Sequence, residues 1–495
     1  MAQRGGLSEY DVRFGEGEGR ERPGAGTPFR ILVLGDFGGS RPLARPWHPV
    51  LVDRDNLDEV MRRSGVELQL PWPDAPESTL AVEGIDDFHP DALYERLPAL
   101  GRLRSLRARV ADPARHPDAA REARVLLGLN APPEAAPAEG QPASGAEWLS
   151  GLLGESPRTE EADPLDVVLR RLGRQYAVAA PPADQAQLLA LLDGAASATV
   201  REILRHPRFQ ALEAAWRGLK TITHRLDTGT DLKVYALDLT RDELTGDLAG
   251  GAEGSHLYKL LAEPESEPWA VAVGLYTFGP AEPDAETLLK LARIARAAGA
   301  PFLAAAADRV AGCDSLAATP DPDDWRTDES DPGTRAWQAL RAQPESQWLG
   351  LALPRFLLRL PYGRKTDPCE RFDFEEMPDV PLHEHYVWGS PALACALLLG
   401  RSFGRDGWNM GASLEQELDG LPLHVYRDAD GSQVKPCAEL ALRERALDRL
   451  LDAGLMVLVS PRGEDRAVLA RWQSLASPLA RLAGPWTTGG ARPSA

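Results

Sequence analysis

The sequence is poor in cysteine and has no cationic excess. It holds 4 cysteines in 495 residues (Cys313, Cys369, Cys395 and Cys437), without a CxxC pair. This spacing excludes a disulfide framework and a zinc knuckle, and it is typical of a protein from a reducing compartment. Asp and Glu number 74 against 55 Lys and Arg, a formal net charge of -19. Long-range attraction to nucleic acid or an anionic membrane is therefore unfavourable, and we expect neither partner.

Long apolar runs are also missing. Residues 1–26 are rich in glycine and charge and lack the apolar stretch of a signal peptide. No later stretch approaches the 18 or so apolar residues of a membrane-spanning helix, so we expect a cytoplasmic protein. Hydrophobic residues at 43% and charged residues at 26% are close to globular averages. Because 495 residues exceed the capacity of one typical core, we expect two or three domains.

Motifs for chemistry are incomplete. The turn at 35–39 (GDFGG) follows an apolar run, but neither GxxxxGK[ST] nor GxGxxG is present, which disfavours nucleotide binding. His383 and His385 would share one face of a strand, but the sequence supplies no third metal ligand near them. The run 428–431 (DADG) opens like a calcium loop, but Cys437 stands where the glutamate is required. A hairpin turn between strands at 423–426 and 432–434 is the better interpretation.

Nucleophilic catalysis has no support either. There is no GxSxG elbow around Ser390, and no histidine adjoins any cysteine, so the cysteines are interpreted as buried small hydrophobes. The sequence thus predicts no catalytic, cofactor-binding or metal-binding residue and no cofactor.

The first part of the chain predicts a small α/β domain. FRILVL at 29–34 is continuously apolar, so 28–36 is expected to form a buried strand. A helix is expected at 53–63, where acidic residues precede Arg62 and Arg63. One further helix is expected over 90–110, with the intervening arginines on a solvated face. Its leucine stripe consists of Leu93, Leu97, Leu100, Leu103 and Leu106.

A mixture of proline, alanine and glycine at 131–147 is the predicted linker. A flexible chain of this length spans roughly 20–25 Å and holds its two neighbours at about millimolar effective concentration. The parts that it joins should therefore pair with each other in cis.

After the linker, helices alternate with strands. Amphipathic helices are predicted at 185–204 and 207–226, the second with Phe209, Leu212 and Trp216 packed on one face. Strands are predicted at 232–239, 269–276, 302–306 and 455–459, and helices after the capping box 240–243, at 285–298 and at 438–453. This order predicts an α/β layer with parallel pairing.

Two ordered sets of blocks resemble the contractile-sheath subunits of the type VI secretion system. PFRILVLGDFGG (28–39), DRDNLDEVM (53–61) and DDFHPDALYERLPALGRLRSLR (86–107) resemble the small subunit, TssB/VipA-like. Blocks at 203–222, 349–363, 383–408 and 446–459 resemble the large subunit, TssC/VipB-like. The chain is thus identified as a fusion of shortened subunits, with domains at 27–130 and 148–480 joined by 131–147.

The resemblance implies an α/β fold in which a small N-terminal α/β domain is linked to a larger α/β domain with an N-terminal helical segment. In this family, small and large subunits pair, exchange strands and build a helical sheath whose contraction drives an inner tube outward without catalysis. Implied partners are sheath-type subunits, either copies of this chain or separate small and large subunits, and then the inner tube protein and baseplate components. The family's unfoldase-binding helix is not recognisable at 148–174, nor is its inner-tube-facing region before residue 495.

Three functions stay open: a structural sheath component, a non-polymerising accessory protein that docks on, caps or regulates sheath subunits, and an enzyme on an α/β layer. We also predict that the two halves contact each other, because the leucine stripe of 93–106 needs a cover. The candidates for this cover are the leucine-rich segments 148–172 and 185–204.

Overall fold

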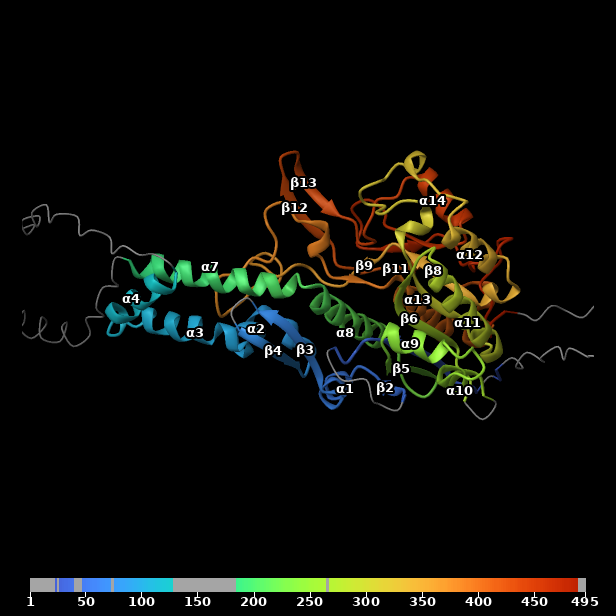
Figure 1. Ribbon diagram of the computed structural model, residues 1–495, viewed down its shortest axis with the longest axis horizontal. Helices are drawn as coiled ribbons and strands as arrows, with labels where there is room; N and C mark the ends of the chain where they lie inside the picture. The colour runs from blue at the N-terminus through green and yellow to red at the C-terminus, as the bar shows by residue number, and fades with distance from the viewer. Residues whose placement is uncertain are drawn as a thin grey trace, which may run out of the picture. The chain divides into compact units, whose positions relative to one another are not determined.

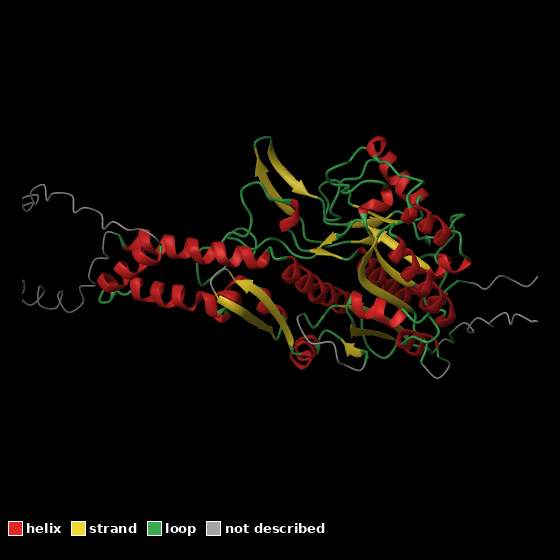
Figure 2. Cartoon of the chain, in the orientation of Figure 1, coloured by secondary structure: helices red, strands yellow, loops and turns green. Residues whose placement is uncertain are grey.

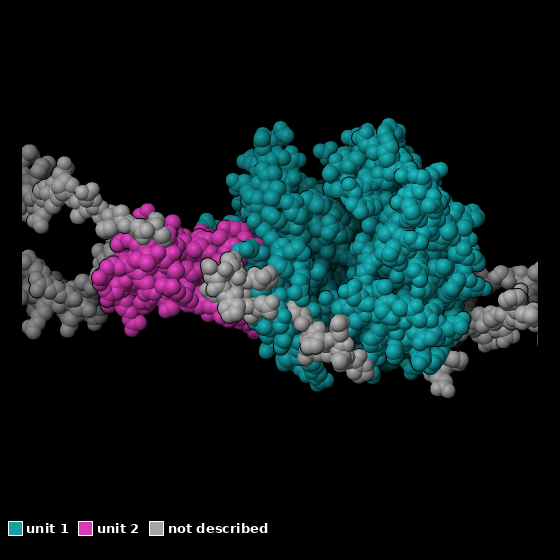
Figure 3. Space-filling model, in the orientation of Figure 1, with its two compact units in different colours: residues 1–92, 202–368, 375–495 teal, residues 93–201, 369–374 magenta. Residues whose placement is uncertain are grey.

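The computed structural model describes residues 23–24, 26–39, 47–72, 75–127, 184–263 and 267–487. The chain divides into two compact units, shown in Figure 3: unit 1 comprises 1–92, 202–368 and 375–495, and unit 2 comprises 93–201 and 369–374. Each unit contains residues from before and after the predicted linker. The compact units therefore differ from the predicted domains 27–130 and 148–480. The linker 131–147 and the candidate helix 148–172 lie outside the described residues.

Unit 1 is built on a nine-stranded sheet in the order β11-β15-β14-β8-β7-β6-β1-β5-β2, whose strands are yellow in Figure 2. The six strands from β14 to β5 run parallel, and β2, β15 and β11 add antiparallel edges. The strands are β1 (Phe29–Gly35), β2 (Val50–Val52), β5 (Leu232–Asp238), β6 (Val271–Phe278), β7 (Phe302–Ala306), β8 (Leu349–Leu353), β11 (Glu417–Leu418), β14 (Met456–Val459) and β15 (Ala467–Leu469). The α/β class with parallel pairing is confirmed.

Helices cover both faces of this sheet (Figure 1). On one face, α13 packs against β6, β7, β8 and α8; on the other, α11 packs against the same strands and against α9, α10 and α12. The helices of unit 1 are α1 (Leu57–Ser64), α8 (Pro207–Arg225), α9 (Arg241–Leu248), α10 (His256–Ala262), α11 (Glu282–Ala298), α12 (Pro332–Arg341), α13 (Pro391–Asp406) and α14 (Glu444–Asp452). Burial on both faces explains why the central strands read as continuous apolar runs.

Smaller elements complete unit 1. Three two-stranded ribbons are described: β3 (Val66–Trp72) with β4 (Ala75–Val82), β9 (Phe356–Leu357) with β10 (Trp388–Gly389), and β12 (His424–Asp428) with β13 (Gly431–Lys435). Short 3₁₀ turns occur at Ile85–Phe88, Asp308–Ala311, Pro322–Asp324, Pro344–Trp348, His383–His385 and Gly407–Ala412. The β12–β13 pair confirms the predicted hairpin around 428–431.

Unit 2 is helical in its described part. It contains α3 (Pro98–Ala111) and α4 (His116–Leu126), and the division between the units cuts α2 (Pro90–Arg96) and α7 (Gln185–Leu204). In Figure 1, α7 runs alongside α3 and α4, and their buried leucines and alanines form one cluster. Among the described residues, no helix combines the length and apolarity that crossing a membrane demands.

The prediction of one helix over 90–110 is wrong. Leu97 adopts extended backbone angles (φ -71°, ψ 122°) between α2 and α3, and Pro98 is the first residue of α3. Proline has no N–H to donate into a preceding turn and disfavours helical angles in the residue before it. The leucine periodicity was a true signal of burial, but Pro98 divides the segment into two helices.

Most other predicted elements are confirmed. Thr240 and Glu243 form both hydrogen bonds of a capping box at α9, and Gly299 ends α11 in the left-handed conformation. Phe209, Leu212 and Trp216 are buried on α8 as predicted. Helix α14 begins at Glu444, later than the expected 438. The strand at 28–36 is also confirmed, but it belongs to the nine-stranded sheet and not to a small domain of its own.

Candidate functional site

Strand β1 lies inside the sheet, third from its β2 edge, and joins two distant parts of the chain. We call the described residues 23–127 the first segment and 184–487 the second segment. β1 pairs in parallel with β5 from Phe29 opposite Leu232 to Gly35 opposite Asp238, and on its other side with β6. All seven residues of β1 are buried. The first segment therefore supplies a central strand of a sheet that the second segment otherwise builds almost alone.

The two ends of β1 are held by tryptophans of the second segment. Before the strand, the indole Nε1 of Trp408 donates to the carbonyl oxygen of Thr27 at 2.8 Å, and its ring lies 5.4 Å from that of Phe29. After the strand, Nε1 of Trp216 donates to the carbonyl oxygen of Phe37 at 3.0 Å, with the two rings edge to face. Each indole combines apolar contact with a hydrogen bond to the first segment's backbone, which fixes the position of β1 along the sheet.

Arg30 is a charged residue inside this apolar strand. Its guanidinium lies 3.9 Å from the ring centroid of Trp269 and 4.9 Å from that of Tyr235, and it donates to the carbonyl oxygen of Glu267 at 2.8 Å. A guanidinium over two aromatic faces keeps a favourable environment without full hydration. Arg30 thus adds an anchor to the second segment where the sequence suggested only an apolar run.

The GDFGG turn after β1 does not hold a phosphate. The backbone N–H groups of Phe37 and Gly38 both donate to Oδ1 of Asp238, at 2.8 and 2.9 Å, and Gly39 donates to the carboxylate of Asp36. Clustered amides of this kind form anion sites when they are free. Here a carboxylate at the end of β5 already occupies the position, so the turn joins the two segments and offers no phosphate site.

Unit 2 contains a second junction between the same two segments. Leu106, Val110 and three alanines of α4 pack on Leu188 and Leu192 of α7. The side chain of Gln185 donates to the carbonyl oxygens of Val110 and Ala111, at 2.8 and 3.0 Å. Of the two predicted covers for the leucine stripe, the helix at 185–204 packs on its C-terminal end, at Leu106 and the partly buried Leu103, and 148–172 lies outside the described residues.

Ion pairs surround this helical junction. Arg107 binds Asp193 through Nε at 2.5 Å and Nη2 at 3.1 Å, and Asp184 accepts from His116 and Arg124. The side chains of Arg107 and Arg124 keep 32% and 21% of their exposure. The predicted solvated face of α3 is therefore partly engaged with α7, because an arginine can bury its stem while its charged end meets a carboxylate.

The HEH motif does not form the predicted strand. His383–His385 is a 3₁₀ turn, and the two imidazoles have different surroundings. Nε2 of His383 lies 2.9 Å from Oε1 of Glu439, and Nζ of Lys435 lies 2.8 Å from Nδ1 of the same ring. Nδ1 of His385 is shielded and has no hydrogen-bond partner among the described residues. A shared metal site on one strand face is therefore not formed.

Glu439 is the centre of this polar cluster. Its backbone has φ +50°, in the left-handed region that a glutamate rarely adopts, and its carboxylate also binds the backbone and side chain of Arg355. Burial alone would raise the pKa of Glu439, but hydrogen bonds from His383 and Arg355 outweigh it and lower the pKa to about 2. The cluster therefore carries a carboxylate that stays ionised over the physiological range.

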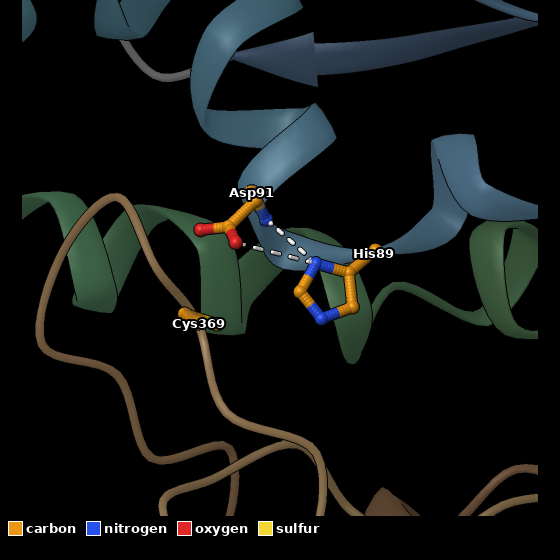
Figure 4. A group of neighbouring side chains, drawn as sticks. All are labelled: His89, Asp91 and Cys369. Carbon is orange, nitrogen blue, oxygen red and sulfur yellow. Dashed lines mark hydrogen bonds and ion pairs between the residues drawn. The ribbon is translucent and has the colours of Figure 1, made fainter.

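A further titratable group includes His89 and Asp91. Figure 4 shows the Asp91 backbone N–H donating to Nδ1 of His89, at 3.2 Å, with the Asp91 carboxylate 3.8 Å from that nitrogen. Both residues belong to unit 1, and Cys369, drawn in the same figure, belongs to unit 2. The contact between His89 and Asp91 is a local cap at the start of α2.

Three cysteines of the described chain are poor nucleophiles. Burial raises the pKa of Cys313 and of Cys437 to about 11, and that of Cys395 to about 12. A thiol with so high a pKa is protonated at neutral pH and reacts slowly. Cys395 and Cys437 are buried and fit the interpretation as small buried hydrophobes, whereas Cys313 is only partly buried.

Most of the residues that join the two segments could not be predicted from local sequence patterns. The sequence predicts that Trp216 is buried, but local patterns do not predict its partner Phe37 or the contacts of Asp238 and Trp408. Asp238 carries a weak signal, because an acidic residue directly after a buried strand often binds backbone N–H groups nearby. Its partners are 200 and 201 residues away, beyond the reach of any local pattern.

Comparisons with known proteins place the two segments in one system. A family model described as "EvpB/VC_A0108, tail sheath N-terminal domain" matches residues 186–476. A model described as "Type VI secretion system, VipA, VC_A0107 or Hcp2" matches residues 9–128. The chain is also 34% identical over 354 residues to the "Type VI secretion system sheath protein TssC1" of Pseudomonas aeruginosa, which covers 67% of this chain and 71% of that protein. The chain therefore belongs to the type VI secretion sheath family and carries its VipA-type and VipB-type parts in one polypeptide.

Proposed function

We propose that this chain is a protomer of a type VI sheath and that its role is structural. Its VipA-type and VipB-type parts are joined in one polypeptide and pair within one molecule. The observation that carries the proposal is the position of β1 between β5 and β6. A central strand cannot leave a parallel sheet without exposing two rows of backbone hydrogen-bonding groups. The two parts therefore act as one folded body.

The matched families are structural, and their membership implies interaction with sheath subunits. In this role the chain would catalyse no reaction and would be located in the cytoplasm. Its partners would be further copies of this chain or separate sheath subunits. The inner tube protein and baseplate components would follow as partners of the assembled structure.

Negative-stain electron microscopy of the purified full chain tests the proposal, alone and mixed with sheath subunits from the same source. The expected result is helical tubes or ring stacks that contain this chain. A chain that binds such subunits, remains a single particle and stops their growth would overturn the protomer proposal and favour a capping accessory protein.

The pairing in cis has a separate test. A protease site placed between Ala131 and Glu147 should yield two fragments that co-elute on gel filtration at micromolar concentration in 0.5 M salt, because β-pairing and buried indoles are insensitive to screening. The matched control carries Val33→Asp, which places a charge at a fully buried position of β1. Fragments that separate without this substitution would contradict pairing through β1.

A further inference from the structure

Unit 1 contains a cavity of about 260 Å³ at the carboxyl ends of the central strands. Asp36 follows β1, Leu275 and Thr277 belong to the end of β6, and Ala305 belongs to β7. The chain reaches β5 through α8, which packs with α13, and it passes from β6 to β7 through α11 on the opposite face. β1 and β6 therefore border the point where the connections change face. In open α/β sheets, this is the crevice where ligands bind.

The lining of this cavity combines apolar walls with a few polar groups. The apolar walls come from Leu212, Ala215, Leu275, Trp388 and Leu393. Arg208 and Arg355 supply the cations. Arg208 lies at the start of α8 and donates to the carbonyl oxygen of Gln69 at 3.4 Å. Arg355 binds Glu439 through Nε and Nη2. Predominantly apolar walls with a few converging polar groups are the usual composition of a small-molecule site.

Ser390 is the observation that points to a missing ligand. It precedes α13 and lines the cavity, yet its side chain makes no capping hydrogen bond to that helix. Its Oγ is shielded from solvent and has no hydrogen-bond partner among the described residues. A buried hydroxyl left without a partner costs free energy, and such groups commonly mark a bound water, ion or ligand. The N-terminus of α13, a helix of 16 residues, adds a positive partial charge at the same place.

The charges around the cavity restrict the ligand. Arg208 acts electrostatically on Asp36, as do the carboxylates of Asp238 and Glu243, and Arg355 binds Glu439. These carboxylates offset the two arginines, and the helix terminus adds roughly half a positive elementary charge. This environment suits a single carboxylate better than a doubly charged phosphate. The volume of about 260 Å³ admits a molecule the size of a substituted benzene ring and is too small for a nucleotide.

We propose that this cavity binds a small monocarboxylate with an apolar body, its carboxylate held by Arg208, Arg355 and the hydroxyl of Ser390. Asp36, Gly39 and Leu68 of the cavity wall come from the VipA-type part, and the other lining residues come from the VipB-type part. A ligand here contacts both parts at once and stabilises their pairing. The site is present in the single chain and does not depend on polymerisation.

Isothermal titration calorimetry of the full chain with benzoate, its neutral analogue benzamide and inorganic phosphate tests the proposal. Benzoate should bind at least about tenfold more tightly than either of the others, since a charge-assisted hydrogen bond to arginine is worth about one factor of ten or more. Saturating benzoate should also raise the thermal midpoint. Equal affinity for benzoate and benzamide, tighter binding of phosphate, or no saturable benzoate binding at millimolar concentration would each overturn the proposal.

Two variants locate the site. Arg208→Gln and Ser390→Ala should each weaken benzoate binding, the first by about tenfold. Arg335→Gln, which changes another exposed arginine on α12, should bind benzoate like the unaltered chain. If Arg208→Gln does not fold, Arg208→Lys keeps the charge but loses the planar donor pair and should still bind more weakly. Unchanged affinity in a folded Arg208 variant would show that benzoate binds elsewhere and would refute the site.

Discussion

The two units join the same pair of chain segments by different means. In unit 1, β1 shares backbone hydrogen bonds with strands on both sides, and Trp216 and Trp408 hold its ends. In unit 2, helices α3 and α4 share a small leucine and alanine cluster with α7, surrounded by ion pairs that keep part of their exposure. One junction is a buried sheet, and the other is a helical contact with charged edges.

This difference predicts unequal local stability. Separation of β1 breaks its backbone hydrogen bonds on both sides and exposes its buried apolar side chains, whereas exposed ion pairs contribute at most about 1 kcal/mol each and are screened by salt. Elements with few buried apolar contacts open first in native proteins. The helical junction should therefore open locally, and the β1 junction should separate only in global unfolding.

The largest expected effect is at the β1 junction. Trp216→Ala should lower the free energy of unfolding by about 3 to 5 kcal/mol, because a fully buried indole and its hydrogen bond to Phe37 are lost together. Urea denaturation followed by circular dichroism measures the change. Trp47→Ala, at a partly buried position, is the matched control and should cost less. An unchanged midpoint for Trp216→Ala would contradict its role in holding β1.

Acid should weaken unit 1 through Glu439. Its pKa in the folded chain, about 2, lies below its ordinary value of 4.5, so its contribution is present above pH 4.5 and is lost as the pH falls toward 2. The full contribution is about 3 kcal/mol, an order-of-magnitude figure for a shift of this size. The free energy of unfolding, measured between pH 6 and pH 3, should fall less steeply in Glu439→Gln. The exposed Glu444→Gln serves as control, and a slope shared by both variants would contradict this account.

Asp238 should have an intermediate effect. Asp238→Ala leaves the N–H groups of Phe37 and Gly38 without their carboxylate, at a cost of about 1 to 3 kcal/mol. Asp238→Asn retains an acceptor oxygen and should recover most of the loss. Chemical denaturation of both variants decides the point. If Asn is as damaging as Ala, the charge matters more than the hydrogen bonds.

The smallest effect is expected in unit 2. Arg107→Ala removes the partner of Asp193, whose side chain is only 11% exposed, and should cost about 1 kcal/mol. Hydrogen exchange of α3 and α7 amides should accelerate, and this difference from the unaltered chain should shrink at high salt. Arg121→Ala, whose partner Asp118 lies on the same helix, should leave exchange in α7 unchanged. Slower opening of unit 2 than of β1 would contradict the predicted order of local stability.

Local signals in the sequence determined many elements. Three examples are the capping box at Thr240, the glycine after α11 and the apolar stripe on α8. Each depends on residues within one or two turns of helix, so the helix ends and the buried face could be predicted from local sequence. The blocks that resemble the two sheath subunits likewise identified the family before any coordinates. The break at Pro98 is also a local signal, but the leucine period continues across it and predicts one unbroken helix.

Only the tertiary structure decided where β1 belongs. Its continuous apolar run predicts burial on both faces and cannot specify its neighbours, because every hydrophobic strand offers the same backbone groups. The same holds for the pairing of Asp238 with the GDFGG turn and for the separate surroundings of His383 and His385. These partners are brought together by chain segments about 200 residues apart, or by a turn that local periodicity does not encode. Their positions follow from packing the whole chain, since long-range contacts are selected by shape, burial and hydrogen-bond satisfaction together.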